Sequence, residues 1–361
     1  MLPDDDLAKH GLNRHAISSP LVPRRESMSV LLNNDKLDRL DHDTIVIGLV
    51  NNMPDAALDA TERQFIALLD AAGGQTKIRL RLFALPEVSR GASARQRLEH
   101  RYSDMAELWP SSIDGLIVTG AEPCAPDLKD EPYWASLIRV LEWAQDKTIS
   151  SVWSCLAAHA AVLHLAGIRR RRLAQKCSGV FACTKVSHHP LTDGMPAQFF
   201  IPHSRYNGLC EAEIVNAGFT ALTRSPETGL DMFIKEGKSL LLFVQGHPEY
   251  QGHTLLREYR RDIGRFLRGE VGTYPNMPKG YFDAAATAHF LQFRERALAD
   301  RSKDMLAELL ADIPDSTLTN TWRPSAVRLY RNWLNLIAAS KRAGVAAGEP
   351  QDCSSLRVSE V

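Results

Sequence analysis

A single cysteine, Cys155, stands at the corner between two different patterns in the stretch SSVWSCLAAHAAVLHLAGI, residues 150–168. An apolar run with strand character precedes it, and an alanine-rich run with helical character follows at once. A thiol at a helix N-terminus lies beside free N–H groups and the positive end of the helix dipole, which favour the thiolate. Cys155 is therefore a candidate nucleophile on a strand-to-helix turn. An inert cysteine buried in the core is the alternative that this segment leaves open.

A histidine and a glutamate two residues apart, His247 and Glu249, follow an apolar run in VQGHPEY. If the chain stays extended there, both side chains point the same way, so the carboxylate can orient the imidazole. The imidazole can then serve a thiol as general base. The alternative is a surface His-Pro turn with a solvated glutamate. Together with Cys155, the pair favours nucleophilic catalysis.

Three more polar groups are candidates for binding a substrate: Lys176 in LAQKCSGVF, Ser204 in PHSRYN and Arg261 in EYRRDIG. Lysine and arginine can bind a carboxylate, arginine through two parallel hydrogen bonds. Each segment also fits an ordinary polar turn or a solvated face. The run IRRRRL, residues 168–173, also has two interpretations. It can attract the phosphates of a nucleotide-like cofactor, or it can be a charged, solvated surface. His159, one helical turn after Cys155, fits a packing or capping role.

The elements that position these residues are apolar strands alternating with amphipathic helices. Strand-like runs cover TIVIGLV, KIRLRLFAL, IDGLIV and TISSVWS, and helical patterns lie between them. This alternation predicts an α/β fold with a parallel sheet that helices cover on both faces. In such sheets ligands bind beyond the carboxyl ends of the strands. Asn51–Asn52, Thr119–Ala121 and Cys155 all fall at predicted strand ends.

The chain divides into an arm, a domain and a tail. Residues 1–40 are polar and aperiodic, which predicts a flexible N-terminal arm. Residues 41–340 form the predicted catalytic domain, with a helical insert at about 284–311. Residues 341–361 are predicted to be a disordered tail.

The composition is that of an ordinary globular protein. Of 361 residues, 44% are hydrophobic and 24% charged, and Lys+Arg and Asp+Glu both count 43. This balance argues against a partner such as bulk nucleic acid or an anionic membrane. The six cysteines form no C-x-x-C pair, and the sequence shows no metal-ligand cluster, so we expect reduced thiols and no bound metal. No apolar signal core is seen, so we expect a cytoplasmic protein.

Many segments of the chain, in order, resemble the homoserine O-acyltransferases of methionine biosynthesis, a family with a class I glutamine amidotransferase-like, flavodoxin-like three-layer fold. The similarity runs from about Thr44 to Leu336 and includes NNMPDAALDATERQF, DGLIVTGA, LEWAQD, KCSGVF, PHSRY, GHPEY, TLLREYRRD and NWLN. The resemblance implies an acyltransferase that needs acyl-CoA (succinyl-CoA or acetyl-CoA) as co-substrate and no bound cofactor. It also implies L-homoserine as acceptor and suggests a homodimer.

The family's roles carry over where residues match. By resemblance, Cys155 is the acyl-accepting nucleophile, His247 the base and Glu249 its partner. Substrate-binding positions fall on Lys176, Ser204 and Arg261, and the backbone of Gly120–Ala121 and Leu156 would form the oxyanion hole.

Three positions depart from the family pattern. Leu156 and His159 stand where tryptophan and glutamine are usual, and Cys124 stands where glycine or glutamate separates succinyl from acetyl users. Because a small neutral thiol resembles glycine more than glutamate, we expect a succinyl donor. Alternatives remain: a glutaminase-type amidotransferase or hydrolase with the same triad, an acyltransferase for another hydroxy amino acid, or a non-catalytic descendant.

Overall fold

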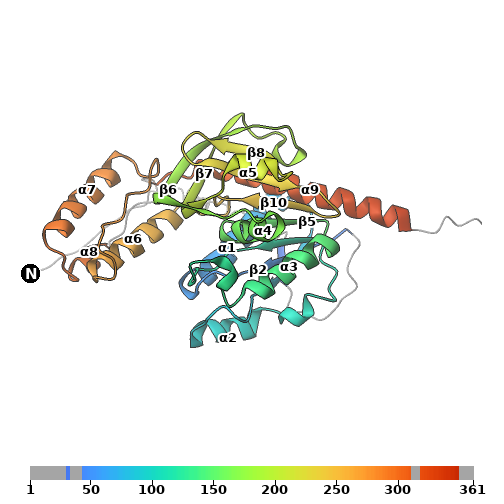
Figure 1. Cartoon of the computed structure of the whole chain (residues 1–361), viewed down its shortest axis with the longest axis horizontal. Coiled ribbons are helices and arrows are strands. Elements are labelled where there is room, and N and C mark those ends of the chain that lie inside the picture. Colours follow the sequence, from blue (N-terminus) through green and yellow to red (C-terminus); the bar gives the residue numbers. More distant parts are fainter. Residues whose placement is uncertain (1–29, 33–42, 310–317, 349–361) are drawn as a thin grey trace, which may run out of the picture.

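One ten-stranded sheet forms the centre of the computed structural model of the chain, which describes residues 30–32, 43–309 and 318–348 (Figure 1). The strand order is β1-β3-β2-β4-β5-β10-β9-β8-β6-β7. The strands are β1 Val30–Leu32, β2 Ile45–Val50, β3 Ile78–Phe83, β4 Gly115–Val118, β5 Ser150–Ser154, β6 Arg171–Lys185, β7 Gln198–Gly208, β8 Thr220–Ser225, β9 Gly229–Lys235 and β10 Leu240–Val244.

The sheet is mixed, which corrects the prediction of a parallel sheet. Along the strand order given above, every neighbouring pair in β1-β3-β2-β4-β5-β10 is parallel. Every neighbouring pair in β10-β9-β8-β6-β7 is antiparallel. Short connections explain the β8–β9 and β9–β10 pairs, because a parallel pair needs a long crossover and an antiparallel pair needs only a turn. The α/β class and the parallel half, which carries the strand ends of interest, are confirmed.

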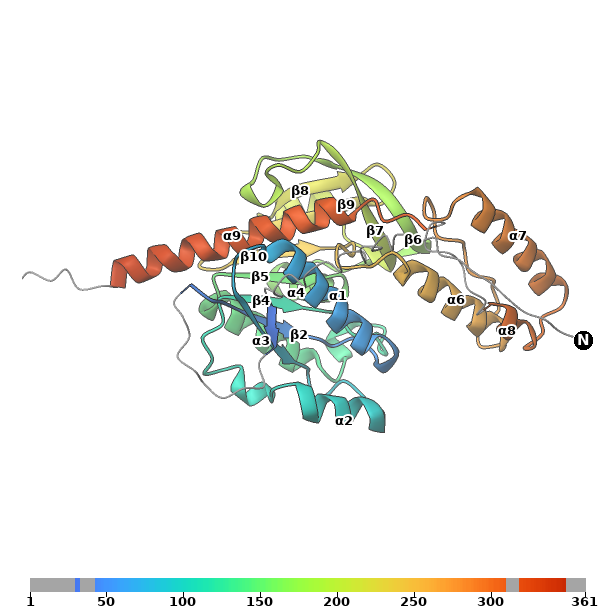
Figure 2. The ribbon, with the colours of Figure 1, turned by 180° about the vertical axis from the view of Figure 1, so that it is seen from behind.

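Helices cover both faces of the sheet, as predicted. The helices are α1 Asp55–Gly73, α2 Ala92–Arg101, α3 Trp134–Lys147, α4 Leu156–Ala166, α5 Glu211–Asn216, α6 Thr254–Leu267, α7 Ala284–Ala299, α8 Met305–Leu309 and α9 Arg323–Gly348, with 3-10 turns at Met105–Glu107, Leu128–Asp130 and Pro190–Thr192. One apolar core contains α1 and α9, which lie side by side on the face seen in Figure 2. A second core joins the other face to α3, α4 and α5.

The predicted arm and tail need correction. Val30–Leu32 belongs to the arm, yet it forms the edge strand β1, parallel to β3, with Val30 buried. The predicted start of the tail, residue 341, is too early, because α9 continues to Gly348. The rest of both segments, 1–29, 33–40 and 349–361, lies outside the described residues.

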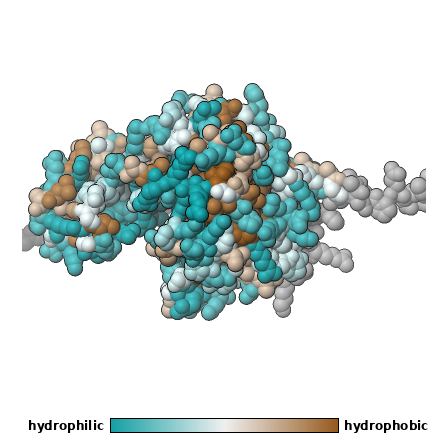
Figure 3. Space-filling model, in the orientation of Figure 1, coloured by the Kyte–Doolittle hydropathy of each residue, from teal (hydrophilic) through white to brown (hydrophobic). Residues whose placement is uncertain are grey.

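The predicted helical insert forms α7 and α8, and residues 310 and 311 lie outside the described part. These helices project from the sheet together with α6 (Figure 1). A third apolar core holds them, built around Tyr281, Phe290, Phe293 and Trp322. The face drawn in Figure 3 is mainly hydrophilic, with apolar residues in small groups. No helix in the described ranges has the length and apolar character to cross a membrane.

Candidate active site

Four neighbouring strands, β2, β4, β5 and β10, run parallel and end at the same edge of the sheet. The loops that follow all four strands line one cavity of about 230 Å³. The loop after β2 is tied to the loop after β4, since the Asn52 backbone N–H donates to Thr119 Oγ1 (2.8 Å) and its side-chain amide donates to the Thr119 carbonyl (3.1 Å). The predicted meeting of strand ends is therefore present.

Cys155 adopts the turn expected of a nucleophile between a strand and a helix. Its φ of 51° and ψ of −110° are unusual, and it is the only non-glycine residue with positive φ in the described part of the chain. Such backbone costs about 1–3 kcal/mol and persists only where surrounding contacts hold it. Here the Cys155 N–H donates to the Val244 carbonyl (2.7 Å), and α4 begins at the next residue. The half-buried thiol lines the cavity.

His247 and Glu249 form a buried pair beside that thiol. His247 Nδ1 lies 2.8 Å from Glu249 Oε1, which leaves the other ring nitrogen for Cys155. Burial alone would lower the pKa of His247, but Glu249 and Cys155, which both interact with the ring, outweigh it and raise the pKa well above its usual range. The ring stacks on Tyr250 at a centroid distance of 4.3 Å. The site can therefore hold an imidazolium next to sulfur.

Gly120 brings a second loop against the start of α4. A Cβ atom at Gly120 would lie 2.6 Å from Leu156 Cβ, so the close approach requires glycine. Ala121 and Leu156 line the cavity, and neither backbone N–H donates a hydrogen bond to another group within the described ranges. Two free N–H groups beside a nucleophile can stabilise an oxyanion.

Lys176, Ser204 and Arg261 converge on one wall of the cavity. Two carboxylates of α6 organise them. Lys176 Nζ donates to Asp262 Oδ2 (2.7 Å), and Arg261 Nη2 donates to Asp262 Oδ1 (2.8 Å). Ser204 Oγ donates to Glu258 Oε2. Burial would raise the pKa of Asp262, but Lys176 and Arg261 hold it below the usual range.

Glu258 and Asp262 are the functional candidates that sequence reasoning missed. Glu258 lines the cavity and also accepts a hydrogen bond from the Tyr250 hydroxyl (2.5 Å). Their spacing of i and i+4 places both on one side of α6, and this was the available signal. The neighbouring arginines in LLREYRRD hid it, because they make the helix look like a basic surface.

Two of the departures from the family pattern, His159 and Cys124, lie in different surroundings. His159 is buried, and its Nε2 lies 3.0 Å from Gln245 Oε1. Burial lowers its pKa to about 4, so it is neutral. Cys124 is exposed and does not line the cavity; its neighbours Glu122 and Pro123 do. The structure thus does not bring Cys124 to the nucleophile. In the described residues there is no group of three or more His, Cys, Asp or Glu side chains placed to hold a metal ion.

Comparison with known proteins gives consistent matches over most of the chain. A family model described as HTS: Homoserine O-succinyltransferase matches residues 22–343. A homoserine O-succinyltransferase of Rhodopseudomonas palustris is 48% identical over 295 residues, which cover 82% of this chain and 89% of the relative. A second, of Methylorubrum extorquens, is 46% identical and covers 83% of this chain and 89% of the relative.

Solved structures match more loosely. A glutamine amidotransferase from Methylobacillus flagellatus has 14% identity and a TM-score of 0.46, with 81% of this chain and 95% of that chain covered. One from Thermotoga maritima has 11% identity and a TM-score of 0.44, with 82% and 99% covered. These likenesses are too weak to carry an argument about function.

Proposed function

Because the chain belongs to the homoserine O-succinyltransferase family, we propose that it moves the succinyl group of succinyl-CoA to the hydroxyl of L-homoserine through a Cys155 thioester. The observation that carries the mechanism is one cavity that holds Cys155 on its strained turn, the His247–Glu249 pair and two free N–H groups. This set supplies a nucleophile, a base and an oxyanion site.

In the first half-reaction the Cys155 thiolate attacks the thioester carbonyl of succinyl-CoA. The Ala121 and Leu156 N–H groups stabilise the oxyanion of the tetrahedral intermediate. When the intermediate collapses, the bond to the CoA sulfur breaks, and His247 gives its proton to that sulfur. CoA leaves as a thiol, Cys155 carries the succinyl group, and the imidazole is neutral. One thioester replaces another, so little bond energy is lost.

In the second half-reaction the acceptor hydroxyl attacks the Cys155 thioester while neutral His247 removes its proton. Glu249 stabilises the imidazolium that forms. Collapse of the second intermediate releases the O-succinyl product and restores the thiolate beside the imidazolium. Two charged groups on the opposite wall fit the acceptor's amino-acid end: Arg261 can bind its carboxylate, and Glu258 can bind its ammonium.

We also propose a homodimer and a cytoplasmic location. The homodimer and the cytoplasmic location are carried by the family resemblance and the sequence. Cys124 stays a predicted donor-selecting position, although its side chain lies outside the cavity. If it acts, it does so by shaping the Glu122–Pro123 loop.

A donor panel tests the proposal. The protein is incubated separately with succinyl-CoA, acetyl-CoA and glutamine, and intact mass is measured before and after L-homoserine is added. We expect a succinyl adduct from succinyl-CoA and O-succinylhomoserine after homoserine. Cys155→Ser should form no adduct, whereas Cys210→Ser, which changes a half-buried thiol outside the cavity, should behave like the parent. An adduct from glutamine alone would favour a glutaminase, an adduct that homoserine leaves in place would point to another acceptor, and no adduct from any donor would contradict an enzyme of this class.

A further inference from the structure

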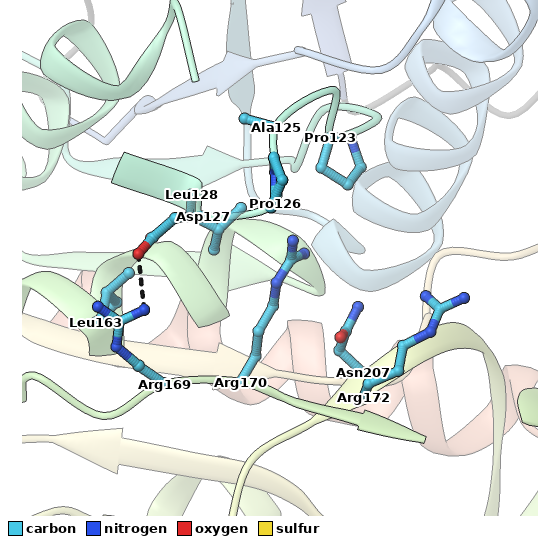
Figure 4. Close-up of a pocket in the computed structure, with 10 residues that line it drawn as sticks. All are labelled: Pro123, Ala125, Pro126, Asp127, Leu128, Leu163, Arg169, Arg170, Arg172 and Asn207. Atoms are coloured by element: carbon cyan, nitrogen blue, oxygen red, sulfur yellow. Dashed lines mark hydrogen bonds and ion pairs between the residues drawn. The ribbon is translucent and has the colours of Figure 1, made fainter. Parts of the chain in front are cut away.

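A second cavity, of about 440 Å³, is drawn in Figure 4. It lies directly beside the catalytic one. The two share Pro123, Arg170, Arg172 and Asn207 in their walls, so one leads into the other. The 123–128 loop forms one side of the second cavity, and the residues at the start of β6 form the other. We call this second cavity the arginine groove.

Three arginines from the run 169–172 line the arginine groove. Arg169 pairs with Asp127 across it, with 2.7 Å between Nη1 and Oδ2. Arg170 extends across the groove toward the opposite loop (Figure 4). Arg172 lies over the ring of Tyr206, 4.4 Å from its centroid, which holds the guanidinium at the groove wall. Arg171 faces away, because neighbouring strand residues alternate, and it pairs with Glu213 instead (2.7 Å).

Arg170 and Arg172 keep their charges free for a ligand. In the described ranges no carboxylate lies within ion-pair distance of either guanidinium. Arg170 is half-buried, and burial lowers its pKa, an effect that the nearby Glu131 carboxylate opposes only in part. Glu131 already accepts a hydrogen bond from the Ala125 N–H (2.7 Å). An anion in the groove would supply the missing partner.

We propose that the arginine groove binds the phosphates of the acyl-CoA donor, and that the uncharged arm of the donor passes Pro123 and Asn207 to bring the thioester to Cys155. This rests on the function proposed above. Acyl-CoA is long, it carries several negative charges on its phosphates, and the arm between the phosphates and the thioester is uncharged, so it needs a basic site that opens into the catalytic cavity. The arginine groove has both properties.

A cavity on the other side of Lys176 is a poorer candidate for the phosphates. It is lined by Lys176 and Arg265, but both cations have carboxylate partners. Lys176 binds Asp262, and Arg265 Nε lies 3.5 Å from Glu270 Oε2. A phosphate there would have to displace or face these carboxylates.

Two donors with the same acyl group separate phosphate recognition from the rest of the reaction. Succinyl-CoA carries the phosphates, and succinyl-N-acetylcysteamine thioester carries the same succinyl group and thioester without them. The variants are Arg170→Gln, Arg172→Gln and, as matched control from the same run, Arg171→Gln. We expect the KM for succinyl-CoA to rise about tenfold in Arg170→Gln and about threefold in Arg172→Gln, the more exposed of the two. Their kcat/KM for the phosphate-free thioester should stay within about twofold of the parent, and Arg171→Gln should leave both donors unchanged.

Other patterns overturn the proposal. An equal loss with both donors would mean that the arginines serve the succinyl carboxylate or the fold, and thermal melting would tell these apart. Parent-like KM values for succinyl-CoA in the Arg170→Gln, Arg172→Gln double variant would mean that the phosphates bind elsewhere. A parent protein that uses neither donor would overturn the proposed function itself, and the groove assignment with it.

Discussion

At the residue scale, the proton on His247 connects the two half-reactions. Glu249 holds that proton, and its charge is one of the two that raise the pKa of the imidazole against the effect of burial. Only neutral imidazole can accept the acceptor's proton, so transfer to homoserine should increase as pH rises through the pKa of His247 in the acyl-enzyme, where Cys155 is uncharged and Glu249 alone raises it. The acidic limb of kcat, under conditions where deacylation limits it, should therefore report His247.

Glu249→Gln removes the charge but keeps the size of the side chain. The pKa of His247 should fall, so the acidic limb should move to lower pH. The plateau rate should drop because the amide orients the ring less well, yet by less than the roughly 10²–10⁴-fold expected for His247→Ala. The measurement is kcat across pH for parent and variant. An acidic limb at the same pH in both would mean that Glu249 does not govern the proton.

The placement of the site residues could be predicted only in part from the sequence. Cys155, His247 and Glu249 carried their own chemical signal, since a thiol at a turn and a His-x-Glu at a strand end are uncommon together. Lys176, Ser204 and Arg261 came from resemblance, because a single cation or hydroxyl in a sequence looks like any solvated group. Cys124 was placed by counting along a loop, and counting does not give the direction of a side chain.

At the scale of elements, the β4 loop must pack tightly on α4 for the two N–H groups to face one point. Gly120→Ala would push a methyl group to 2.6 Å from Leu156 Cβ, so the loop or the helix must shift. We expect kcat to fall about 10²-fold with little change in thermal stability, because oxyanion donors are sensitive to small displacements. Gly252→Ala is the matched control, since a Cβ there meets nothing within 4 Å. Parent-like turnover in Gly120→Ala would remove this loop from the oxyanion site.

Helices and strands could be predicted where the pattern of hydrophobic residues fits only one kind of secondary structure. The strands β2, β4 and β5 are buried along their whole length. Continuous apolar runs mark β2 and β4, whereas β5 combines Val152 and Trp153 with three serines. The strands of the antiparallel half are harder to predict from the sequence, because β6 and β7 mix exposed and buried positions without regular alternation. The edge strand β1 could not be predicted, because three residues are too few to show a periodic pattern of hydrophobic residues. Its pairing partner β3 also lies far along the chain.

At the scale of the whole molecule, α9 stabilises the sheet from the face opposite α4. Trp333 is fully buried, and its indole N–H donates to Ser150 Oγ (2.9 Å) at the start of β5, the strand that directly precedes Cys155. Trp333→Ala should lower the free energy of unfolding by about 3–5 kcal/mol. Arg342→Ala, an exposed change on the same helix, should alter it by less than about 0.5 kcal/mol. Urea unfolding measures both, and a Trp333→Ala protein as stable as the parent would contradict the packing of α9.

The central claim is that one cavity carries an acyl group on Cys155 between two substrates. The most direct measurement is a rapid-quench time course of intact mass: the protein is first loaded with succinyl-CoA, freed of excess donor, and then mixed with L-homoserine. We predict a succinyl adduct on Cys155 that disappears at a rate no slower than kcat, with O-succinylhomoserine appearing in equal amount. Steady turnover with no adduct, or an adduct that homoserine discharges more slowly than kcat, would contradict the account.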